Sequence, residues 1–414
     1  MAESEQRQSL DISLRSSVWI EKETLMLSMF KNLPLGTSDF KALRSRGQIY
    51  VDKTSMLLRL AEGRSAKVLF TRPRRFGKTL LLSTFESLFA EGLRHFDGLA
   101  IDGRWTDHTY PVVRLDFSQL AFFADAAEFE RKFRDFIAFS FSEAGFECEQ
   151  PDGSLGFRLS RWFNGLPPDS LVVLVDDYDA PLLAAMGSPS TFEAVASLLR
   201  EFFAVLHCNE DVLRFLFVTG TVKPANARVF DGFGSLTDIS LDSAYGTLAG
   251  FTIEELERDL TRPLFNAASE QCLGKEALLS QLEEMYGGYR FDALAEQPVL
   301  SPWSVLRFLA EPARGFEQYW FSSPGLSAKL LDNLGENPLL VPSAYSTAHE
   351  VRLSELQAAP LPNDLGQVAL LAQAGYFTVK SVNAAGFASL GYPNREVTVG
   401  MAQIYADMLL GRRR

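Results

Sequence analysis

Residues 67–88, KVLFTRPRRFGKTLLLSTFESL, restrict the fold of this chain more than any other stretch. An apolar run leads into a short polar loop, and Gly77-Lys78-Thr79 then opens a segment with apolar residues at helical spacing. This order predicts a strand, a phosphate-binding loop and a helix. A helix N-terminus offers unpaired N–H groups and a favourable dipole to the phosphates of a nucleotide. We therefore expect Lys78 to reach the β- and γ-phosphates of ATP and the Thr79 hydroxyl to hold Mg²⁺.

The loop departs from the general pattern G-x-x-x-x-G-K-[ST], because Arg72 stands where the first glycine belongs. Arginine disfavours a positive φ and Pro73 has no N–H, so the backbone offers phosphate fewer donors than usual. The three arginines of the loop carry guanidinium groups that could replace these donors. The alternative is a chance Gly-Lys-Thr in a basic loop, which the preceding strand and the following helix disfavour. The residues expected to contact the nucleotide are Arg72, Pro73, Arg74, Arg75, Phe76, Gly77, Lys78, Thr79 and Leu80.

A second candidate site follows the apolar residues 171–175, which predict a buried strand. The strand ends in Asp176 and Asp177, as in a Walker B motif. We expect Asp176 to hold Mg²⁺ through water and Asp177 to polarise the attacking water. The second acid is usually Glu, and the shorter Asp177 predicts slow hydrolysis, with Asp179 as the next candidate for this role. The alternative is an Asp-rich turn at the end of a strand.

Two further segments are candidates for the same site. Residues 214–221 predict a strand that ends in Thr219 and Thr221. Either threonine could act as a sensor, a residue that hydrogen-bonds the γ-phosphate or the attacking water. The alternative is that both threonines only form the turn after the strand. Residues 47–54 predict a short strand that ends in a helix cap at Asp52 or Thr54. We expect residues 50–53, including Asp52 and Lys53, to line the adenine pocket, although Asp52 is equally consistent with a cap alone.

Strands and helices alternate through this half of the chain, since residues 110–117 predict a strand and residues 126–141 and 191–207 predict helices. This alternation is typical of an α/β fold with a parallel sheet, helices on both faces and a ligand crevice at the carboxyl ends of the strands. The phosphate-binding loop, the two acids and the two threonines all fall at such ends.

The second half of the sequence has a different character. From Phe251 onward it reads as helices without intervening strands, and Thr252 is placed to cap the first of them. Residues 365–376 predict a helix, and residues 377–382 and 387–392 predict a β-hairpin with a four-residue turn. Such a helix and hairpin are typical of a winged-helix element, which we expect to serve packing rather than DNA binding because it carries little positive charge.

Four segments together resemble the bacterial AAA-ATPase-like family: residues 40–43 (FKAL), 50–54 (YVDKT), 72–79 (RPRRFGKT) and 175–179 (VDDYD). The substituted phosphate-binding loop is itself typical of that family. The resemblance implies a P-loop NTPase core of the additional-strand (AAA/STAND-like) class, followed by a helical lid and, in typical members, by a nuclease domain of the PD-(D/E)XK type. It also implies a lid arginine that senses the γ-phosphate, for which Arg290 is the candidate; a surface arginine beside a Gly-Gly turn is the alternative.

The resemblance covers about residues 33–397 and suggests a division of the chain. We expect no nuclease domain in it, because the tail is too short to supply the Asp, Glu and Lys of such a site. The predicted parts are an N-terminal extension (1–32), the ATPase core (33–246), the helical lid (247–344), the winged-helix-like segment (345–397) and a C-terminal tail (398–414).

Composition limits the classes of protein to consider. The 414 residues carry a net charge of −12, which gives no electrostatic footprint for nucleic acid. No apolar run approaches the roughly 20 residues of a membrane helix, and the N-terminus lacks the pattern of a secretion signal. The three cysteines are far apart and exclude a disulfide framework. A cytoplasmic protein is therefore expected.

The sequence thus predicts an ATP-binding protein that hydrolyses ATP slowly and uses it as a conformational switch, with ATP and Mg²⁺ as its ligands. The alternative is a non-hydrolysing nucleotide sensor or scaffold for a separate effector protein such as a nuclease. A metabolite kinase shares the phosphate-binding loop but would need an acceptor-substrate motif, which we do not find. The oligomeric state is left open.

Overall fold

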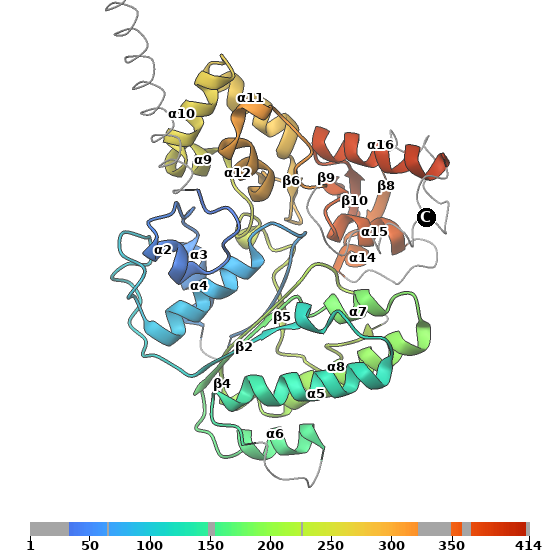
Figure 1. The fold of residues 1–414 in the computed structure, drawn as a ribbon. Helices are drawn as coiled ribbons and strands as arrows, with labels where there is room; N and C mark the ends of the chain where they lie inside the picture. The colour runs from blue at the N-terminus through green and yellow to red at the C-terminus, as the bar shows by residue number, and fades with distance from the viewer. Residues whose placement is uncertain are drawn as a thin grey trace, which may run out of the picture.

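The computed structural model describes residues 33–63, 66–147, 154–224, 227–321, 349–357 and 366–410 (Figure 1). The predicted N-terminal extension and part of the predicted lid lie outside these residues. Within them, no helix is long and apolar enough to cross a membrane.

A five-stranded parallel sheet forms the centre of the molecule, with the strand order β2-β3-β4-β1-β5. Because β4 lies between β1 and β3, the sheet has the additional strand that the sequence predicted. Strands β3 and β4 are buried along their whole length, as expected for apolar runs covered on both faces. The strands are β1 (Ala66–Thr71), β2 (Val112–Asp116), β3 (Leu171–Asp176), β4 (Leu213–Gly220) and β5 (Thr237–Asp238).

Helices cover both faces of this sheet, which confirms the predicted α/β fold (Figure 1). Alternate residues of β3 enter opposite cores: Val172 and Leu174 pack with α3 and α4, whereas Val173 and Val175 pack with α5, α6 and α8. The predicted helices at 126–141 and 191–207 are confirmed as α5 and α8. The helices are α2 (Phe40–Ser45), α3 (Thr54–Glu62), α4 (Lys78–Glu91), α5 (Ala126–Ser142), α6 (Leu155–Phe163), α7 (Ala180–Ala185) and α8 (Pro189–Cys208), with short 3-10 turns η1 (Phe117–Leu120), η2 (Glu210–Val212) and η4 (Ser243–Tyr245).

A group of helices with its own core follows, and we call residues 253–321 the helical lid. Thr252 caps its first helix through a capping box with Glu255, as predicted. The prediction of helices without strands is wrong at one place, where β6 and β7 form a small antiparallel pair. The elements are α9 (Ile253–Asp259), α10 (Thr261–Glu270), α11 (Lys275–Tyr286), β6 (Tyr289–Arg290), β7 (Pro298–Val299), α12 (Pro302–Ala310) and η5 (Pro312–Arg314).

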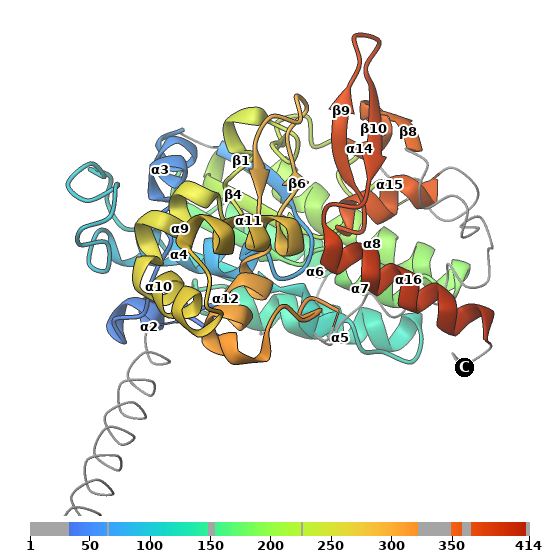
Figure 2. The same cartoon turned by 90° about the horizontal axis from the view of Figure 1, so that it is seen from above.

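The described residues 349–410 form a small α+β unit, which we call the C-terminal module. The predicted hairpin is confirmed as β9 and β10, and it stands out from the body of the molecule (Figure 2). A third strand, β8, pairs with β10 and was not predicted. Helix α16 packs back against α11 of the helical lid. The elements are β8 (His349–Arg352), α14 (Leu353–Gln357), α15 (Gly366–Gln373), β9 (Thr378–Val382), β10 (Phe387–Gly391) and α16 (Arg395–Leu409).

Candidate nucleotide-binding site

The phosphate-binding loop, residues 72–77, connects β1 to α4 at the carboxyl edge of the sheet. Two of its residues have left-handed backbones: Arg75 with φ +68° and Gly77 with φ +93°. Gly77 directly precedes the helix and its carbonyl accepts the N–H of Leu81. A glycine suits this position because it adopts a positive φ without steric cost. The first N–H groups of α4 therefore remain available to a ligand, as helix starts allow.

The buried side chain of Lys78 connects this loop to the neighbouring strand ends. Its Nζ lies 3.1 Å from the carbonyl oxygen of Arg72 and 3.3 Å from that of Pro73. It also lies 3.4 Å from the Thr221 Oγ1 after β4 and 3.8 Å from the Asp177 Oδ1 after β3. The structure thus brings Lys78 and Asp177 together, as the sequence predicted for two motifs far apart in the chain.

Thr219 lies behind the two acids rather than beside the cavity. Its hydroxyl donates to Asp176 Oδ1 at 2.7 Å, and it accepts the N–H of Asp177 at 3.4 Å. Thr219 is fully buried and Asp176 is almost so. The hydroxyl therefore positions the Asp176 carboxylate. Of the two threonines proposed as sensors, Thr221 is the one in contact with Lys78.

Asp177 is the acid that lines the cavity, and its side chain keeps about a third of its surface exposed. Its backbone is left-handed, with φ +49°. Burial raises its pKa to about 7, with smaller contributions from Asp176 and Asp179, while the charge of Lys78 opposes the rise.

Asp179 has another role: its buried carboxylate accepts the N–H groups of Thr221 and Val222 and fixes the turn after β4.

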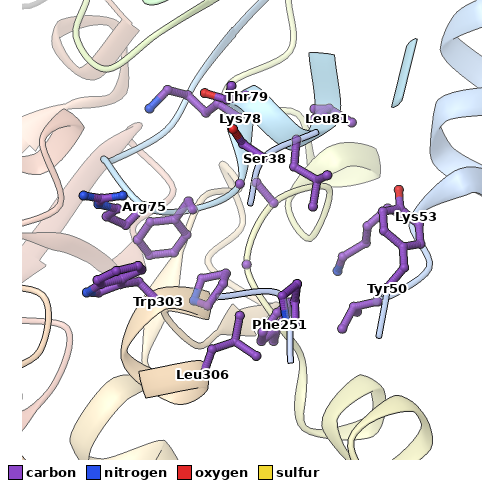
Figure 3. Close-up of a pocket in the computed structure, with 18 of the residues that line it drawn as sticks. Ser38, Tyr50, Lys53, Arg75, Lys78, Thr79, Leu81, Phe251, Trp303 and Leu306 are labelled. Atoms are coloured by element: carbon purple, nitrogen blue, oxygen red, sulfur yellow. The ribbon is translucent and has the colours of Figure 1, made fainter. Parts of the chain in front are cut away.

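A cavity of about 470 Å³ extends from the phosphate-binding loop toward the helical lid. Figure 3 shows Arg75 over Trp303 at one side of it and Tyr50 and Lys53 at the opposite side. The wall of the cavity opposite the phosphate-binding loop is mainly apolar, which suits a nucleotide base. Its residues there include Pro34, Ile49, Tyr50, Val51, Phe251, Leu260, Pro302, Trp303 and Leu306.

The two residues predicted to hold adenine differ in position. Lys53 lines the cavity, and its Nζ lies 2.6 Å from both carboxylate oxygens of Glu255 in the helical lid. Asp52 does not line it; one carboxylate oxygen accepts the N–H and hydroxyl of Thr54, and the other accepts the N–H of Ala100. The geometry supports the alternative interpretation, in which Asp52 stabilises the start of α3 by accepting the N–H of its first residue, although Lys53 occupies the N-cap position itself.

Arg72 does not face the phosphate cavity, which corrects the expectation for its guanidinium. The group is buried between the rings of Phe70 and Phe291, at 4.3 and 4.5 Å from their centroids. Its Nη1 donates to the carbonyls of Thr71 and Ser240, and its Nη2 donates to that of Tyr245. Burial lowers its pKa to about 9, so it stays charged at neutral pH. Arg72 replaces the usual glycine as a core residue that joins the sheet to the helical lid.

The other two loop arginines do line the cavity. Arg75 is exposed and its guanidinium stacks over Trp303 of α12, 4.5 Å from the ring. Arg74 is partly buried, its pKa is lowered mainly by burial, and its carbonyl accepts the indole N–H of Trp320. The proposal that loop arginines supply positive charge to phosphate therefore stands for Arg74 and Arg75 and not for Arg72.

Arg290 is also not brought to Lys78. It lies in β6, where its backbone N–H donates to Thr378 Oγ1 at 2.7 Å. Its side chain lines a separate, smaller cavity together with Arg72. The expectation of a lid arginine at the γ-phosphate is not met in this arrangement, because the two-residue strand β6 faces the C-terminal module instead.

Comparison with known proteins agrees with this geometry. The model of the family described as "Predicted AAA-ATPase" matches residues 34–230. A protein of Azotobacter chroococcum mcd 1, described as "Uncharacterized protein in vnfD 5'region", is 30% identical over 378 residues, which are 90% of this chain and 69% of that protein. The chain belongs to the AAA-ATPase-like family.

Two solved structures are more distant from this AAA-ATPase-like chain. The Walker-type ATPase paby2304 of Pyrococcus abyssi is 13% identical and aligns over 84% of this chain and 94% of its own, with a TM-score of 0.38. The ORC2 protein of Aeropyrum pernix, solved as ADPNP-ADP complexes, is 10% identical over 87% of this chain and 93% of its own, with a TM-score of 0.35. Neither similarity is close enough to carry an argument about function.

The oxygen groups near the loop fit the magnesium ion that AAA-type ATPases use with their nucleotide. Thr79, the second residue of α4, lines the cavity, whereas Asp176, the last residue of β3, is buried behind it beside Thr219. Hydroxyl and carboxylate oxygens are ligands that Mg²⁺ accepts, with water and substrate phosphates completing its shell. Among the described residues no cluster of three or more His, Cys, Asp or Glu could hold a metal alone. The donor set thus suits an ion bound together with nucleotide phosphates.

Phe76 of this AAA-ATPase-like site has a second contact, which the sequence did not predict. It lines the cavity, as expected of a residue near the nucleotide, and its buried ring packs edge-on against Tyr289 and Phe291 at 4.8 and 5.2 Å. The phosphate-binding loop is therefore anchored to the helical lid by an aromatic side chain. The signal in the sequence was a lone large apolar residue within a polar loop.

Proposed function

We propose that this chain binds ATP with Mg²⁺ in the cavity between the phosphate-binding loop and the helical lid and hydrolyses it slowly. The observation that carries the proposal is the position of Lys78, whose Nζ lies at the start of α4 and 3.8 Å from Asp177. A cation, free helical N–H groups and a carboxylate at one edge of a parallel sheet are the parts that phosphoryl transfer needs.

Each residue has a distinct role in this proposal. Lys78, the first N–H groups of α4 and the guanidinium groups of Arg74 and Arg75 bind the phosphates. Thr79 and Asp176 would hold Mg²⁺, which neutralises charge that develops on the phosphate oxygens when it is bound. Asp177 orients the attacking water and accepts its proton.

Slow turnover follows from Asp177 itself. A pKa of about 7 leaves its carboxylate partly protonated at neutral pH, and a protonated acid cannot accept the proton of the water. The side chain is also one methylene shorter than the usual Glu.

The contacts of the loop support a role as a conformational switch. Phe76 packs against Tyr289 of β6, and the indole of Trp320 donates to the carbonyl of Arg74. On the apolar side of the cavity, Lys53 pairs with Glu255 of α9. A ligand that moves the loop or this cavity wall therefore acts on the helical lid through direct contacts.

The second candidate function is a nucleotide sensor that does not hydrolyse ATP and serves as a scaffold for a separate effector protein. It is favoured by the raised pKa of Asp177, since a neutral Asp177 removes the repulsion between this acid and the γ-phosphate. The β9–β10 hairpin, which projects from the body, is the surface that we propose for such an effector (Figure 2).

One experiment separates the two functions. ATP affinity by calorimetry and phosphate release are measured on the same purified sample, for the parent chain and for Asp177→Asn. An ATPase shows release that falls strongly in the variant while ATP still binds. A sensor shows tight binding without release in either protein. A parent chain that binds no ATP would contradict both.

A further inference from the structure

A second, small cavity lies where the sheet, the helical lid and the C-terminal module meet. Its volume is about 50 Å³, larger than the roughly 10–15 Å³ that one water molecule needs. Its walls come from the start of the phosphate-binding loop, the segment after β4, β6, α15 and β9. It is separate from the nucleotide cavity, since neither Arg290 nor Lys223 lines the latter.

Two arginines that line this cavity each have one buried side-chain N–H without a partner among the described residues. Arg72 is 1% exposed, and both of its Nη atoms already donate to backbone carbonyls. The Nε of Arg72 and the Nε of Arg290 are buried, and neither has a hydrogen-bond partner in the part of the chain that the structure describes. Buried charged donors are destabilising when unpaired, so native structures usually satisfy them with protein, water or ligand atoms.

The charge around the cavity is positive. Lys223 lines it as a third cation, with its Nζ 2.6 Å from Asp238. Lys380 does not line the cavity; its Nζ donates to the carbonyl of Pro393, and burial followed by the nearby charge of Arg290 lowers its pKa.

Two acids act on this cluster of cations. Asp238 pairs with Lys223, and the charges of Asp238 and then Asp292 stabilise the charged form of Arg72. The carboxylate of Asp292 is engaged elsewhere, because it accepts the N–H groups of Leu294, Glu296 and Gln297. The three cations that line the cavity, Arg72, Lys223 and Arg290, outnumber these two carboxylates, which leaves an excess of positive charge there.

We propose that this cavity binds a small inorganic oxyanion of the phosphate or sulfate type. Its oxygens accept charge-assisted hydrogen bonds from the Nε groups of Arg72 and Arg290. The ammonium group of Lys223 attracts the anion electrostatically. The cavity is too small for a nucleoside, which restricts the ligand to the inorganic ion. A bound ion ties β6 to the residue that begins the phosphate-binding loop, and so stabilises the contact between the helical lid and the core.

The test is a calorimetric titration of inorganic phosphate into the full chain and into Arg290→Gln. The matched control is Arg395→Gln, because Arg395 is an exposed arginine that pairs with Glu284 on the surface. Lys78→Ala serves to remove any phosphate bound at the loop. We expect the parent, the control and Lys78→Ala to bind phosphate, and Arg290→Gln to bind it roughly tenfold or more weakly.

Three results would overturn the proposal. The first is that the parent chain binds no phosphate, which would mean that water fills the cavity. The second is that Arg290→Gln binds phosphate with the same affinity as the parent. The third is that Lys78→Ala loses all phosphate binding.

A measurement without variants gives an independent answer. Phosphate should slow amide hydrogen exchange in β6 and β9 of the parent, whereas protection confined to residues 72–80 would place the ion at the loop and contradict the proposal.

Discussion

Trp320 and Arg74 join the helical lid to the phosphate-binding loop, since the indole Nε1 of Trp320 donates to the carbonyl oxygen of Arg74 at 3.2 Å. The backbone N–H of Trp320 donates to Glu396 Oε1 at 2.7 Å, at the start of α16. Gly375 approaches the loop from the same side, and a Cβ there would lie 2.7 Å from side-chain atoms of Pro73. The loop is therefore held by the lid and by the C-terminal module together.

Trp320→Phe should weaken this coupling, because it removes the indole N–H that donates to the Arg74 carbonyl. The loss of one hydrogen bond costs about 0.5–1.5 kcal/mol, so the melting temperature should fall by roughly one or two degrees. If the contact also positions the loop, ATP affinity should fall a few-fold. Calorimetric titration and thermal melting measure the two effects, with Trp162→Phe in α6 as the control far from the loop. A lower melting temperature with unchanged affinity would show that the contact only supports the fold.

Lys78→Ala should reduce ATP affinity by roughly hundredfold or more, since the ammonium makes charge-assisted bonds of about 1.5–3 kcal/mol each to phosphate oxygens. Calorimetry with ATP and Mg²⁺ measures this loss. Lys275→Ala is the control, because that lysine is exposed and pairs with Glu257 on the surface. Unchanged affinity in Lys78→Ala would refute the assignment of the phosphate site.

The parallel sheet and the phosphate site could be predicted because their signals are local. The apolar runs of β3 and β4 identify buried strands, and Gly77-Lys78-Thr79 identifies a helix start at which phosphate binds. The roles of Arg72 and Arg290 could not be predicted in this way. The Arg72 guanidinium lies between Phe70, its near neighbour in sequence, and Phe291, which only the folded lid brings there.

The short elements were missed for a related reason. Strands β6 and β7 have two residues each and show no alternation that a sequence can reveal. Their pairing turns Arg290 toward Thr378 and away from the nucleotide cavity. A resemblance in sequence transfers the position of a residue along the chain, but it does not transfer the direction of its side chain.

Hydrolysis, where it is measured, should rise with pH through the pKa of Asp177. This pKa is raised to about 7, so the side chain is mainly protonated at pH 6 and mainly a carboxylate at pH 8. The value of kcat/KM reports the free protein and should therefore increase between these two pH values. Asp177→Asn should bind ATP but show turnover lowered by roughly 10²–10⁴-fold, with a flat pH profile. Wild-type turnover in this variant would mean that another group holds the attacking water.

Arg74→Ala should weaken ATP binding more than Arg75→Ala does. Arg74 is partly buried beside the cavity, where a charge-assisted bond of about 1.5–3 kcal/mol corresponds to roughly tenfold or more in affinity. Arg75 is exposed and stacked on Trp303, so its loss should cost only a few-fold. Arg134→Ala on α5 is a matched surface control. If both loop variants bind ATP as the parent does, the loop contacts phosphate through its backbone and Lys78 alone.

The last prediction concerns Glu396, a buried acid that links the C-terminal module to the helical lid. Its carboxylate accepts the N–H of Trp320 and the hydroxyl of Ser304, and burial raises its pKa to about 7 from the ordinary 4.5. The folded protein therefore binds this proton more tightly than the unfolded chain. Stability from this group is fully present below pH 4.5 and is lost as the pH rises toward 7.

The Glu396→Gln variant isolates this effect, because its amide stays neutral at every pH and nearly matches the protonated acid in shape. One pKa unit corresponds to about 1.4 kcal/mol, so the parent should lose up to roughly 3 kcal/mol relative to the variant between pH 4.5 and pH 8. Denaturant unfolding of both proteins across this range measures the difference, and the comparison cancels groups such as Asp177 that titrate in both. A constant difference in unfolding free energy would mean that Glu396 is charged in the folded protein throughout, and that its two hydrogen bonds outweigh the cost of burial.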